Sequence, residues 1–459
     1  MKLSDIKIAY FLGIGGIGMS AIARYFKAIG IEVHGYDKTR NDFTIQLEKE
    51  GFIIHYDQDP GAIPTQVITG RRGIVIYTPA IPKDHSEFIF LQSKYVKLYK
   101  RAEILGMISR DSYTIAVAGT HGKTTTSCMI AHILNECGIN FTAFLGGVSS
   151  NFHTNYFHRQ DGISLRQQPV MVVEADEFDR SFLHLSPDIA IITSTDADHL
   201  DIYGVAEEVK QSFQEFADRM RENGVLIMND QLDLHGNEMV FRYGTKDSSE
   251  ARYDNIEISG HKFHFTYHFK EISARVLIGL PGFHNVENAT AAITACLSLG
   301  APLDKIIAAC ATFKGVKRRF DYVIETEKYV VIDDYAHHPT ELKACIRSVR
   351  QLYPDKKLTG IFQPHLYSRT RDFADGFAEA LDMLDECWLL DIYPARELPI
   401  EGINTEFLAL KMKRTPLLMA KENVIRKLEE GKPELLVILG AGDIDQLVKP
   451  IQNAYAQDC

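Results

Sequence analysis

The sequence predicts an α/β protein of three domains. Its 459 residues correspond to about three domains of average length. Apolar runs that predict buried strands recur along the chain, and each is followed by a polar or glycine-rich loop. Strand, turn, helix and strand within about thirty residues is typical of a parallel sheet. Ligands of open α/β sheets bind at the carboxyl ends of the strands, so a site is expected in these loops.

The first unit occupies the start of the chain. Residues 6–12 form an apolar run that predicts a buried strand, and residues 19–29 have the apolar spacing of a helix, which Gly30 ends. Further strands are predicted at residues 31–37 and 73–80. We therefore expect a first domain over residues 1–105.

A second unit starts again with a strand at residues 113–119. It leads into a loop and then into a helix that Gly138 ends. Further buried strands are predicted at 170–175 and 188–195. Residues 149–168 have no clear period, and we expect a surface excursion there.

The third unit repeats the pattern of strand and polar loop. Its strands are predicted within residues 329–339, 356–365, 387–393 and 435–443. We therefore expect a second domain over residues 106–320 and a third over residues 321–459.

Composition narrows the class of function. Lys and Arg number 50 and Asp and Glu number 61, which gives a net charge of −11. An acidic chain does not attract nucleic acid or anionic lipid as a whole, so local groups must hold any anionic ligand. No apolar run approaches the ~20 residues of a membrane span, and the start lacks the order of a signal peptide. The seven cysteines include no CxxC pair, which favours reduced thiols in the cytoplasm. We expect a cytoplasmic enzyme without nucleic-acid binding or membrane insertion.

The sharpest motif is a glycine-rich loop, Gly119–Thr126, between a predicted strand and a predicted helix. Its backbone N–H groups and the helix N-terminus suit a phosphate. Lys123 is expected to reach the β- and γ-phosphates, and Thr124 to offer its hydroxyl to Mg²⁺. Val117 stands where the usual spacing has its first glycine, so a chance turn is the alternative interpretation. The strand–loop–helix context favours nucleotide binding.

A second glycine-rich loop has glycines at positions 13, 15 and 18, and Asp37 ends the next strand. This pattern is typical of dinucleotide binding, in which the acid holds a ribose. A tight structural turn and the pyrophosphate of another nucleotide are the alternatives. Because a phosphate loop already follows at position 119, we favour a nucleotide-linked substrate.

Carboxylates follow two predicted strands of the second unit. Glu174 comes directly after one strand, and His199 lies in the segment that follows the next. Such groups could bind a metal that bridges phosphates on the neighbouring loop. For Asp176, Asp196 and Asp201 we expect ordinary solvated loop residues.

Further polar motifs lie toward the carboxyl terminus. Asn285 is expected to be the N-cap of an alanine-rich helix. The basic run 317–319 could bind phosphate, although such runs are usually solvated. Residues 333–339 place two acids and two histidines after a strand, and residues 363–371 place a histidine and two arginines after another. Arginines there could bind a carboxylate or a phosphate.

Taken in order, these motifs resemble the Mur ligase family. The resemblance covers nearly the whole chain and is carried by residues 13–20, 119–126, 174–177, 196–201, 283–289, 318–320, 333–339 and 363–373. It implies a Rossmann-like N-terminal domain for a UDP-sugar, a central P-loop ATPase domain and a Rossmann-like C-terminal domain for an amino acid. The implied reaction joins L-alanine to the carboxylate of UDP-N-acetylmuramate through an acyl-phosphate, with ATP as co-substrate and two Mg²⁺ ions, in peptidoglycan synthesis.

The resemblance also implies roles for individual residues. Lys123 would stabilise the transferring phosphoryl group, Thr124 and Glu174 would bind one Mg²⁺, and His199 would bind a second. The implied catalytic residues are Lys123, Glu174, His199, Asn288, Arg319, Asp334 and His337. The implied ATP site consists of Gly119, Thr120, His121, Gly122, Lys123, Thr124, Thr125, Asn285, Asn288, Arg319 and Asp334.

Two further sites follow from the same resemblance. The UDP-substrate would bind to Gly15, Gly16, Ile17, Gly18, Ser20 and Asp37. The amino acid would lie near His337, His365, Arg369 and Arg371. Several positions depart from the family pattern and leave the fine substrate contacts open, namely Tyr36, Ala336, Leu366 and Arg396.

Three alternatives remain open beside the alanine ligase. A sibling ligase would attach a recycled tripeptide to the same UDP-sugar, and the sequence of residues 13–20 disfavours it. An NAD-dependent oxidoreductase would use the loop at 13–18, but it leaves Lys123 and Glu174 without a role. A non-catalytic nucleotide-binding regulator is disfavoured by the intact Lys123 and metal candidates. Oligomeric state does not follow from the sequence.

Overall fold

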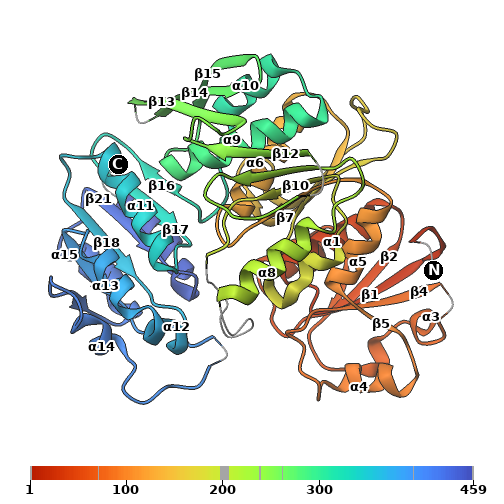
Figure 1. Cartoon of the computed structure of the whole chain (residues 1–459). Helices are drawn as coiled ribbons and strands as arrows, with labels where there is room; N and C mark the ends of the chain where they lie inside the picture. Colours follow the sequence, from red (N-terminus) through yellow and green to blue (C-terminus); the bar gives the residue numbers. More distant parts are fainter. Residues whose placement is uncertain are drawn as a thin grey trace. The chain divides into compact units, whose positions relative to one another are not determined.

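The computed structural model describes residues 3–70, 72–196, 206–236, 239–260, 262–395 and 397–456. Its strands form three sheets of five, ten and six strands (Figure 1). The chain packs as two compact units. The first unit contains the amino-terminal sheet and most of the central sheet, and the second contains the carboxyl-terminal sheet with residues 255–265 and 277–286. The predicted α/β class is therefore confirmed, whereas the domain boundaries near 105 and 320 stay predictions.

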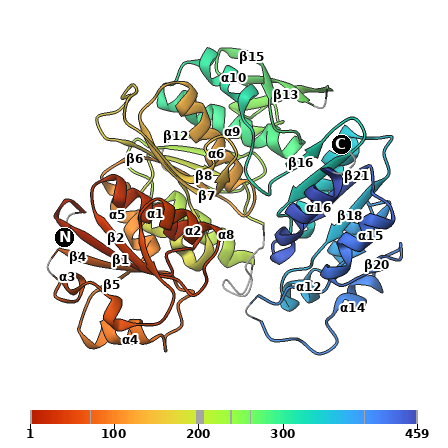
Figure 2. The ribbon, with the colours of Figure 1, turned by 180° about the vertical axis from the view of Figure 1, so that it is seen from behind.

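The amino-terminal sheet is parallel, with the strand order β3-β2-β1-β4-β5. Its strands are β1 (Ile8–Leu12), β2 (Glu32–Tyr36), β3 (Ile53–His55), β4 (Gly73–Tyr77) and β5 (Leu98–Lys100). Its helices are α1 (Ile17–Ala28), α2 (Asp42–Lys49), α3 (Thr65–Ile68), α4 (Ser86–Ser93) and α5 (Arg101–Arg110). Successive residues of a strand face opposite sides: Phe11 packs in the core under α1 and α5, and Tyr10 packs in the core under α3 and α4 (Figures 1 and 2).

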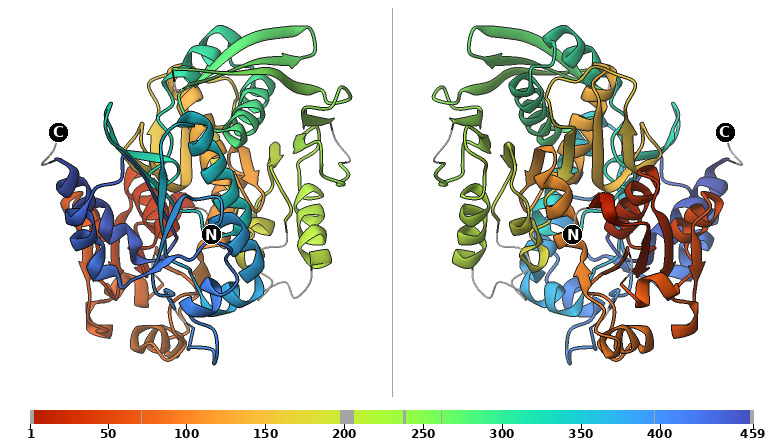
Figure 3. Two further views of the ribbon diagram at one scale, coloured as in Figure 1. Left: turned by 90° about the vertical axis from the view of Figure 1, so that its left-hand side faces the viewer. Right: turned by 90° about the vertical axis from the view of Figure 1, so that its right-hand side faces the viewer.

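The central sheet has the strand order β15-β14-β13-β12-β11-β10-β6-β9-β7-β8. Its strands are β6 (Tyr113–Ala118), β7 (Phe141–Ser149), β8 (Thr154–Arg159), β9 (Val170–Glu174), β10 (Ile189–Ile192), β11 (Val225–Asn229), β12 (Met239–Gly244), β13 (Ala251–Ser259), β14 (Lys262–Phe269) and β15 (Ile272–Ile278). The last three strands form one end of the sheet (green in Figure 3). Its helices are α6 (Lys123–Glu136), α8 (Ala206–Ala217), α9 (Phe283–Leu299) and α10 (Leu303–Thr312).

One hydrophobic core joins the amino-terminal sheet to the central sheet. Phe26 of α1 and Ile104 of α5 belong to the same buried cluster as Phe144 of β7 and Phe182. Helix α1 packs directly on β7 and β8. The expectation of a surface excursion at 149–168 is therefore wrong for its first half, because β8 pairs antiparallel with β7 and buries Asn155 and Tyr156. Tertiary packing of this edge strand overrides a sequence without clear alternation.

The carboxyl-terminal sheet has the order β16-β17-β21-β18-β19-β20, and only β16 is antiparallel to its neighbour. Its strands are β16 (Asp321–Glu325), β17 (Val330–Asp334), β18 (Leu358–Phe362), β19 (Glu386–Leu389), β20 (Leu417–Leu418) and β21 (Leu435–Leu439). Its helices are α11 (Pro339–Leu352), α12 (Tyr367–Asp372), α13 (Ala374–Leu381), α14 (Thr405–Ala409), α15 (Val424–Glu430) and α16 (Val448–Ala456). The predicted strands are confirmed here, each a few residues shorter than its apolar run.

Two expectations from composition can be compared with this fold. The six described cysteines are free and buried, as expected for reduced thiols. No described helix combines the length and the apolar character that crossing a membrane requires.

Candidate active site

The phosphate loop connects the carboxyl end of β6 to the first turn of α6. Gly119 and Gly122 have φ angles of 132° and 81°, which side-chain-bearing residues rarely adopt. A Cβ on Gly119 would lie 2.0 Å from Thr193 Oγ1, and one on Gly122 would lie 2.5 Å from Asn288 Oδ1. Val117 is fully buried inside β6, so the strand extends through the position where the usual motif has a glycine. The predicted loop is confirmed as a strand-to-helix turn.

The loop is fastened to the end of the neighbouring strand β10. Thr120 Oγ1 and Ser194 Oγ are 2.8 Å apart, and the backbone N–H of His121 donates to Ser194 Oγ at 2.8 Å. His121 Nε2 lies 3.2 Å from a carboxylate oxygen of Asp196. Asp196, expected to be an ordinary solvated residue, therefore contacts the phosphate loop. His199 and Asp201 lie outside the described residues.

Lys123 is held by a buried carboxylate, Glu177, that is not among the predicted site residues. Its Nζ donates to Glu177 Oε1 at 2.8 Å and to the carbonyl oxygen of Gly119 at 2.5 Å. Burial by itself lowers the pKa of Lys123, but Glu177, then Glu174 and Asp176, outweigh it and raise the pKa. Lys123 therefore remains a cation at neutral pH. Only the spacing Glu174-x-x-Glu177 could have indicated Glu177, because its burial arises from the turn after β9.

Glu174 ends β9, the neighbour of β6 in the sheet. Its Oε2 accepts a hydrogen bond from the backbone N–H of Gly146 at 3.0 Å. Thr124 lies in the first turn of α6. A carboxylate and a hydroxyl are the oxygen donors that Mg²⁺ prefers, so these two residues fit the predicted ion. Within the described ranges, no three His, Cys, Asp or Glu side chains converge as metal ligands.

Asn288 supports the phosphate loop from α9. Its Oδ1 accepts a hydrogen bond from Thr126 Oγ1 at 3.2 Å, and both side chains are buried. Thr125 is buried beside them along α6. The N-cap interpretation of Asn285 is wrong, because α9 begins at Phe283 and places Asn285 in its first turn. There its amide donates to the carbonyl oxygen of Pro281 at 2.6 Å.

The amino-terminal glycine loop is held by Asp37. One carboxylate oxygen accepts the backbone N–H of Gly15 at 2.8 Å, and the other accepts that of Thr39 at 3.1 Å. Gly16 is the N-cap of α1, and Ile17 begins the helix. The pattern of glycines and acid is thus confirmed as one local structure, in which Asp37 contacts the loop backbone itself.

Two side chains connect this loop to the central sheet. Arg101 packs on Gly18, where an added Cβ would lie 2.9 Å from its Cδ, and its guanidinium donates to Asp176 at 3.3 Å. Ser20 is fully buried, and its hydroxyl accepts a hydrogen bond from Asn155 of β8 at 2.9 Å. The fold therefore places Ser20 behind the loop. Its predicted contact with the UDP-substrate stays a prediction.

The second unit carries a separate polar cluster around Glu341 in the first turn of α11. Arg319 Nη1 lies 3.2 Å from Glu341 Oε1, and the backbone N–H of His337 donates to Glu341 Oε2 at 3.0 Å. Burial, together with the charges of Arg369 and Arg319, outweighs the carboxylate of Glu341 and lowers the pKa of His337 to about 4. His337 is therefore neutral at pH 7. Glu341 is not among the residues predicted from the sequence, although the preference for acidic residues in a first helical turn could have indicated it.

Asp334 ties the end of β17 to the segment before β16. Its carboxylate accepts the backbone N–H groups of Phe320 and Ala336, each at 2.8 Å. Burial raises the pKa of Asp334 to about 6, against the opposing charge of Arg319. Its neighbour Asp333 lies 3.5 Å from Arg318, and burial raises its pKa to about 7. The basic run at 317–319 is therefore partly structural, and Arg318 also donates to the carbonyl oxygen of Gly440 at 2.6 Å.

The elevated pKa of Asp333 predicts a pH dependence of stability. The folded value of about 7 exceeds the unfolded value of about 3.9, so folding takes up a proton between them. This contribution is complete below pH ~4 and is lost as pH rises through ~7. Asn cannot lose this proton, so the melting temperature of Asp333→Asn should fall less than that of wild type as pH rises. We expect the difference between the two melting temperatures to change by about 5 °C from pH 5 to pH 8, in favour of the variant. Melting curves of both proteins, with the exposed Asp355→Asn as control, test this, and parallel pH profiles would contradict it.

Of the residues predicted to lie near the amino acid, His337 follows β17, and His365, Arg369 and Arg371 follow β18. The ring of His365 lies 6.2 Å from that of His337 and stacks on Tyr393 at 5.7 Å. Arg369 is buried, whereas Arg371 is half-exposed and pairs with Asp372 at 2.7 Å. The structure thus brings His337 and His365 together and places Arg371 at the surface.

Two of the departures from the family pattern lie beside this cluster. Leu366 has a φ of 72°, which is strained for a residue with a Cβ, and its N–H donates to Tyr393 at 2.9 Å. Ala336 is buried and donates its N–H to Asp334. The third departure, Tyr36, packs edge-on against His85 at 4.5 Å in the first unit, and Arg396 lies outside the described residues.

These loops and carboxylates define a phosphate-binding α/β protein, and comparisons with known proteins identify its family. Family models match residues 9–113 (Mur ligase family, catalytic domain), 117–296 (Mur ligase middle domain) and 318–444 (Mur ligase, glutamate ligase domain). The chain belongs to the Mur ligase family. The resemblance stated from its motifs is thereby confirmed.

Individual relatives extend over the whole chain. It is 46% identical over 459 residues to a UDP-N-acetylmuramate–L-alanine ligase of Christiangramia forsetii, with 99% of each chain covered. It is 45% identical to the Porphyromonas gingivalis protein of that name, covering 99% of this chain and 100% of the relative. Among solved structures, the UDP-N-acetylmuramate–alanine ligase of Thermotoga maritima superposes with a TM-score of 0.82 at 27% identity, covering 99% and 100%. A murein peptide ligase of Psychrobacter arcticus shares the fold, with a TM-score of 0.70 at 23% identity and 98% of each chain covered.

Proposed function

We propose that this chain joins L-alanine to the lactyl carboxylate of UDP-N-acetylmuramate, with cleavage of ATP to ADP and phosphate, in cytoplasmic peptidoglycan synthesis. The observation that carries the proposal is the 46% identity, over nearly the full length of both chains, to a relative named for that reaction. The fixed phosphate loop with its cationic Lys123 supports the ATP-dependent step.

A carboxylate does not react with an amine until one of its oxygens becomes a leaving group. The carboxylate oxygen therefore takes the γ-phosphoryl group of ATP, which releases ADP and forms an acyl-phosphate. The alanine nitrogen then attacks the carbonyl carbon, the C–O bond to phosphate breaks, and the nitrogen loses a proton. Charge on the transferring phosphoryl group is the main quantity that the protein must stabilise.

We infer that Lys123 supplies this stabilisation. We propose that its Nζ leaves Glu177 when ATP binds and contacts the γ-phosphoryl oxygens, while the loop N–H groups bind the phosphates. Mg²⁺ bound by Thr124 and Glu174, and a second ion at His199, would offset phosphate charge. Asn285, Asn288, Arg319 and Asp334 are proposed for the rest of the ATP site.

The remaining substrates are assigned to the other two loops. We propose that the UDP-sugar binds the glycine loop that Asp37 fastens, and that alanine binds beside His337 and His365. With a pKa of about 4, His337 is neutral at pH 7, so it does not repel an incoming ammonium group.

Release of ADP with each acceptor tests this function. We expect turnover with UDP-N-acetylmuramate and L-alanine to exceed turnover with glycine by at least about tenfold, because one buried methyl group contributes about 1–3 kcal/mol of discrimination. A murein tripeptide in place of alanine tests the sibling ligase, and NAD⁺ reduction tests the oxidoreductase. Faster turnover with the tripeptide, or no ATP-dependent product with alanine, would refute the proposal.

A further inference from the structure

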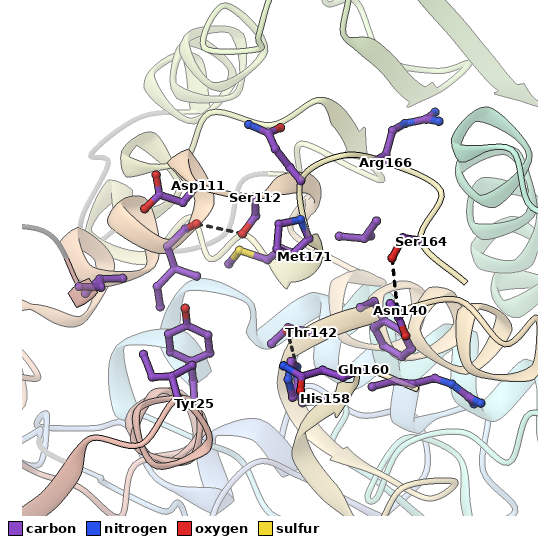
Figure 4. Close-up of a pocket in the computed structure, with 18 of the residues that line it drawn as sticks. Tyr25, Asp111, Ser112, Asn140, Thr142, His158, Gln160, Ser164, Arg166 and Met171 are labelled. Carbon is purple, nitrogen blue, oxygen red and sulfur yellow. Dashed lines mark hydrogen bonds between the residues drawn. The ribbon is translucent and has the colours of Figure 1, made fainter. Parts of the chain in front are cut away.

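Two features of the first unit lie outside the function proposed above. One is a cavity of about 790 Å³, whose wall includes Tyr25, Asn140 and Met171 (Figure 4). Its two arginines, Arg159 and Arg166, already donate to oxygens of neighbouring protein groups, so the wall favours no particular ligand and we assign it none. The other feature is a cation between the two glycine-rich loops.

This cation is Arg101, the first residue of α5. It packs against Gly18 in the first turn of α1. A Cβ added to Gly18 would lie 2.9 Å from Cδ of Arg101, 3.0 Å from its Nη1 and 3.2 Å from its Nε. The guanidinium therefore lies directly on the helix turn that follows the loop proposed for the UDP-sugar.

A second contact connects the guanidinium to the surroundings of the phosphate loop. Nη2 of Arg101 donates to Oδ2 of Asp176 at 3.3 Å. Asp176 precedes Glu177, which accepts a hydrogen bond from Lys123 at 2.8 Å. Burial lowers the pKa of Lys123, and Asp176 is one of the carboxylates whose charges outweigh burial and raise it. Arg101 and Lys123 thus share a neighbouring carboxylate, one cation on the side of each loop.

The guanidinium of Arg101 keeps donors for a ligand. Across the part of the chain that the structure describes, its contact with Asp176 is its one hydrogen bond or ion pair. The distance of 3.3 Å exceeds the about 2.7–2.9 Å that is typical of such pairs. The side chain of Asp176 is 41% exposed, and exposed pairs contribute little. The other N–H donors of the planar guanidinium suit a second carboxylate.

The proposed reaction requires a cation between the two loops. UDP-N-acetylmuramate would present its diphosphate to the glycine loop and its lactyl carboxylate to the γ-phosphoryl group of ATP. The reacting oxygen and phosphorus must come within about 3–3.5 Å of each other, although both groups are negatively charged. Lys123 serves the phosphoryl group, so the carboxylate needs a cation of its own. A cation that binds one carboxylate oxygen offsets the repulsion and leaves the other oxygen to attack.

We propose that Arg101 binds the lactyl carboxylate of UDP-N-acetylmuramate and orients it toward ATP. In the free protein Asp176 occupies part of the guanidinium, and the substrate carboxylate takes its place. Because this exchange replaces one carboxylate with another, Arg101 stays paired in both states. The inference rests on the proposed function, since it assigns a residue to the carboxylate of that substrate.

Two sugar nucleotides that differ in the lactyl group test the assignment. UDP-N-acetylglucosamine has the uridine, diphosphate and acetamido sugar of UDP-N-acetylmuramate, but it lacks the carboxylate. Each is titrated calorimetrically into the full chain with Mg²⁺ and a non-hydrolysable ATP analogue at saturation. We expect Arg101→Gln to weaken UDP-N-acetylmuramate by at least about tenfold and to leave the affinity for UDP-N-acetylglucosamine nearly unchanged. Arg101→Lys, which keeps the charge, should recover part of the loss.

Two further variants separate substrate binding from a structural role of the ion pair. Asp176→Asn breaks the pair but keeps the guanidinium, so it should bind UDP-N-acetylmuramate at least as tightly as wild type. Arg110→Gln, at the exposed last residue of the same helix, is the matched control and should bind both nucleotides as wild type does. Equal losses for both nucleotides in Arg101→Gln would place the diphosphate on Arg101. Equal losses in Asp176→Asn and Arg101→Gln would make the pair structural, and either result overturns the proposal.

Turnover of wild type distinguishes a failure of this inference from a failure of the proposed function. If wild type releases ADP only with UDP-N-acetylmuramate and L-alanine, and Arg101→Gln keeps the wild-type affinity and rate, the inference alone is wrong. If wild type shows no such ADP release, the proposed function is wrong and the inference falls with it. A melting curve for each variant confirms that the titrations report on folded protein.

Discussion

Replacing Lys123 with alanine is expected to lower the turnover number by at least about 100-fold, because a cation that balances developing phosphoryl charge contributes this much or more. Its Nζ is fixed 2.8 Å from Glu177, and the surrounding carboxylates keep it charged. ADP release under saturating ATP and UDP-N-acetylmuramate measures the effect. A rate near that of wild type would refute the phosphate-loop assignment.

Lys123→Ala should also lower the stability of the fold, and this effect can be separated from the loss of turnover. Glu177 is 2% exposed, and removing the cation from a buried pair typically costs about 3–5 kcal/mol. We expect Lys123→Ala to melt several degrees below wild type. The double variant Lys123→Ala/Glu177→Gln should regain most of the melting temperature and none of the turnover. Lys210 is an exposed lysine that pairs with Asp233. The matched control Lys210→Ala should therefore keep the wild-type melting temperature and turnover.

The second large effect is expected at Asp37. Its carboxylate holds the N–H groups of Gly15 and Thr39, and each hydrogen bond to a charged group contributes about 1.5–3 kcal/mol. Asp37→Ala should therefore release the glycine loop and weaken binding of UDP-N-acetylmuramate by about tenfold or more. Binding of ATP should stay nearly unchanged, because the ATP site is proposed at the loop after β6. Calorimetric titration with each nucleotide measures both affinities.

The same titration decides between two functions of the glycine loop. If the protein is an oxidoreductase, NAD should bind to wild type, and Asp37→Ala should abolish this binding. Asp57→Ala, an exposed carboxylate of the same sheet region, is the control and should bind every ligand as wild type does. Tight NAD binding to wild type, or equal losses of ATP and UDP-sugar affinity in Asp37→Ala, would contradict the assignment.

The sequence by itself determined the order of strands and loops and the chemistry of the loops. Parallel strands buried on both faces are continuous apolar runs, so β1, β6 and β9 are visible in the chain. The loop at Gly119 and Gly122 could be predicted from the sequence, because glycine adopts the positive φ angles found there and residues with a Cβ rarely do. The contact of Asp37 with Gly15 could also be predicted, because the two residues follow β1 and β2, which are joined by one helix and pair in parallel.

Only the tertiary structure decided which side chains meet across elements. Glu177 reaches Lys123, and Glu341 joins Arg319 to His337, because turns and helix ends bring together residues whose types alone are unremarkable. β8 joins the sheet through packing on α1 and pairing with β7, without a clear period of its own. Local backbone preferences depend on the type of each residue, whereas burial and charge pairing depend on how distant segments pack.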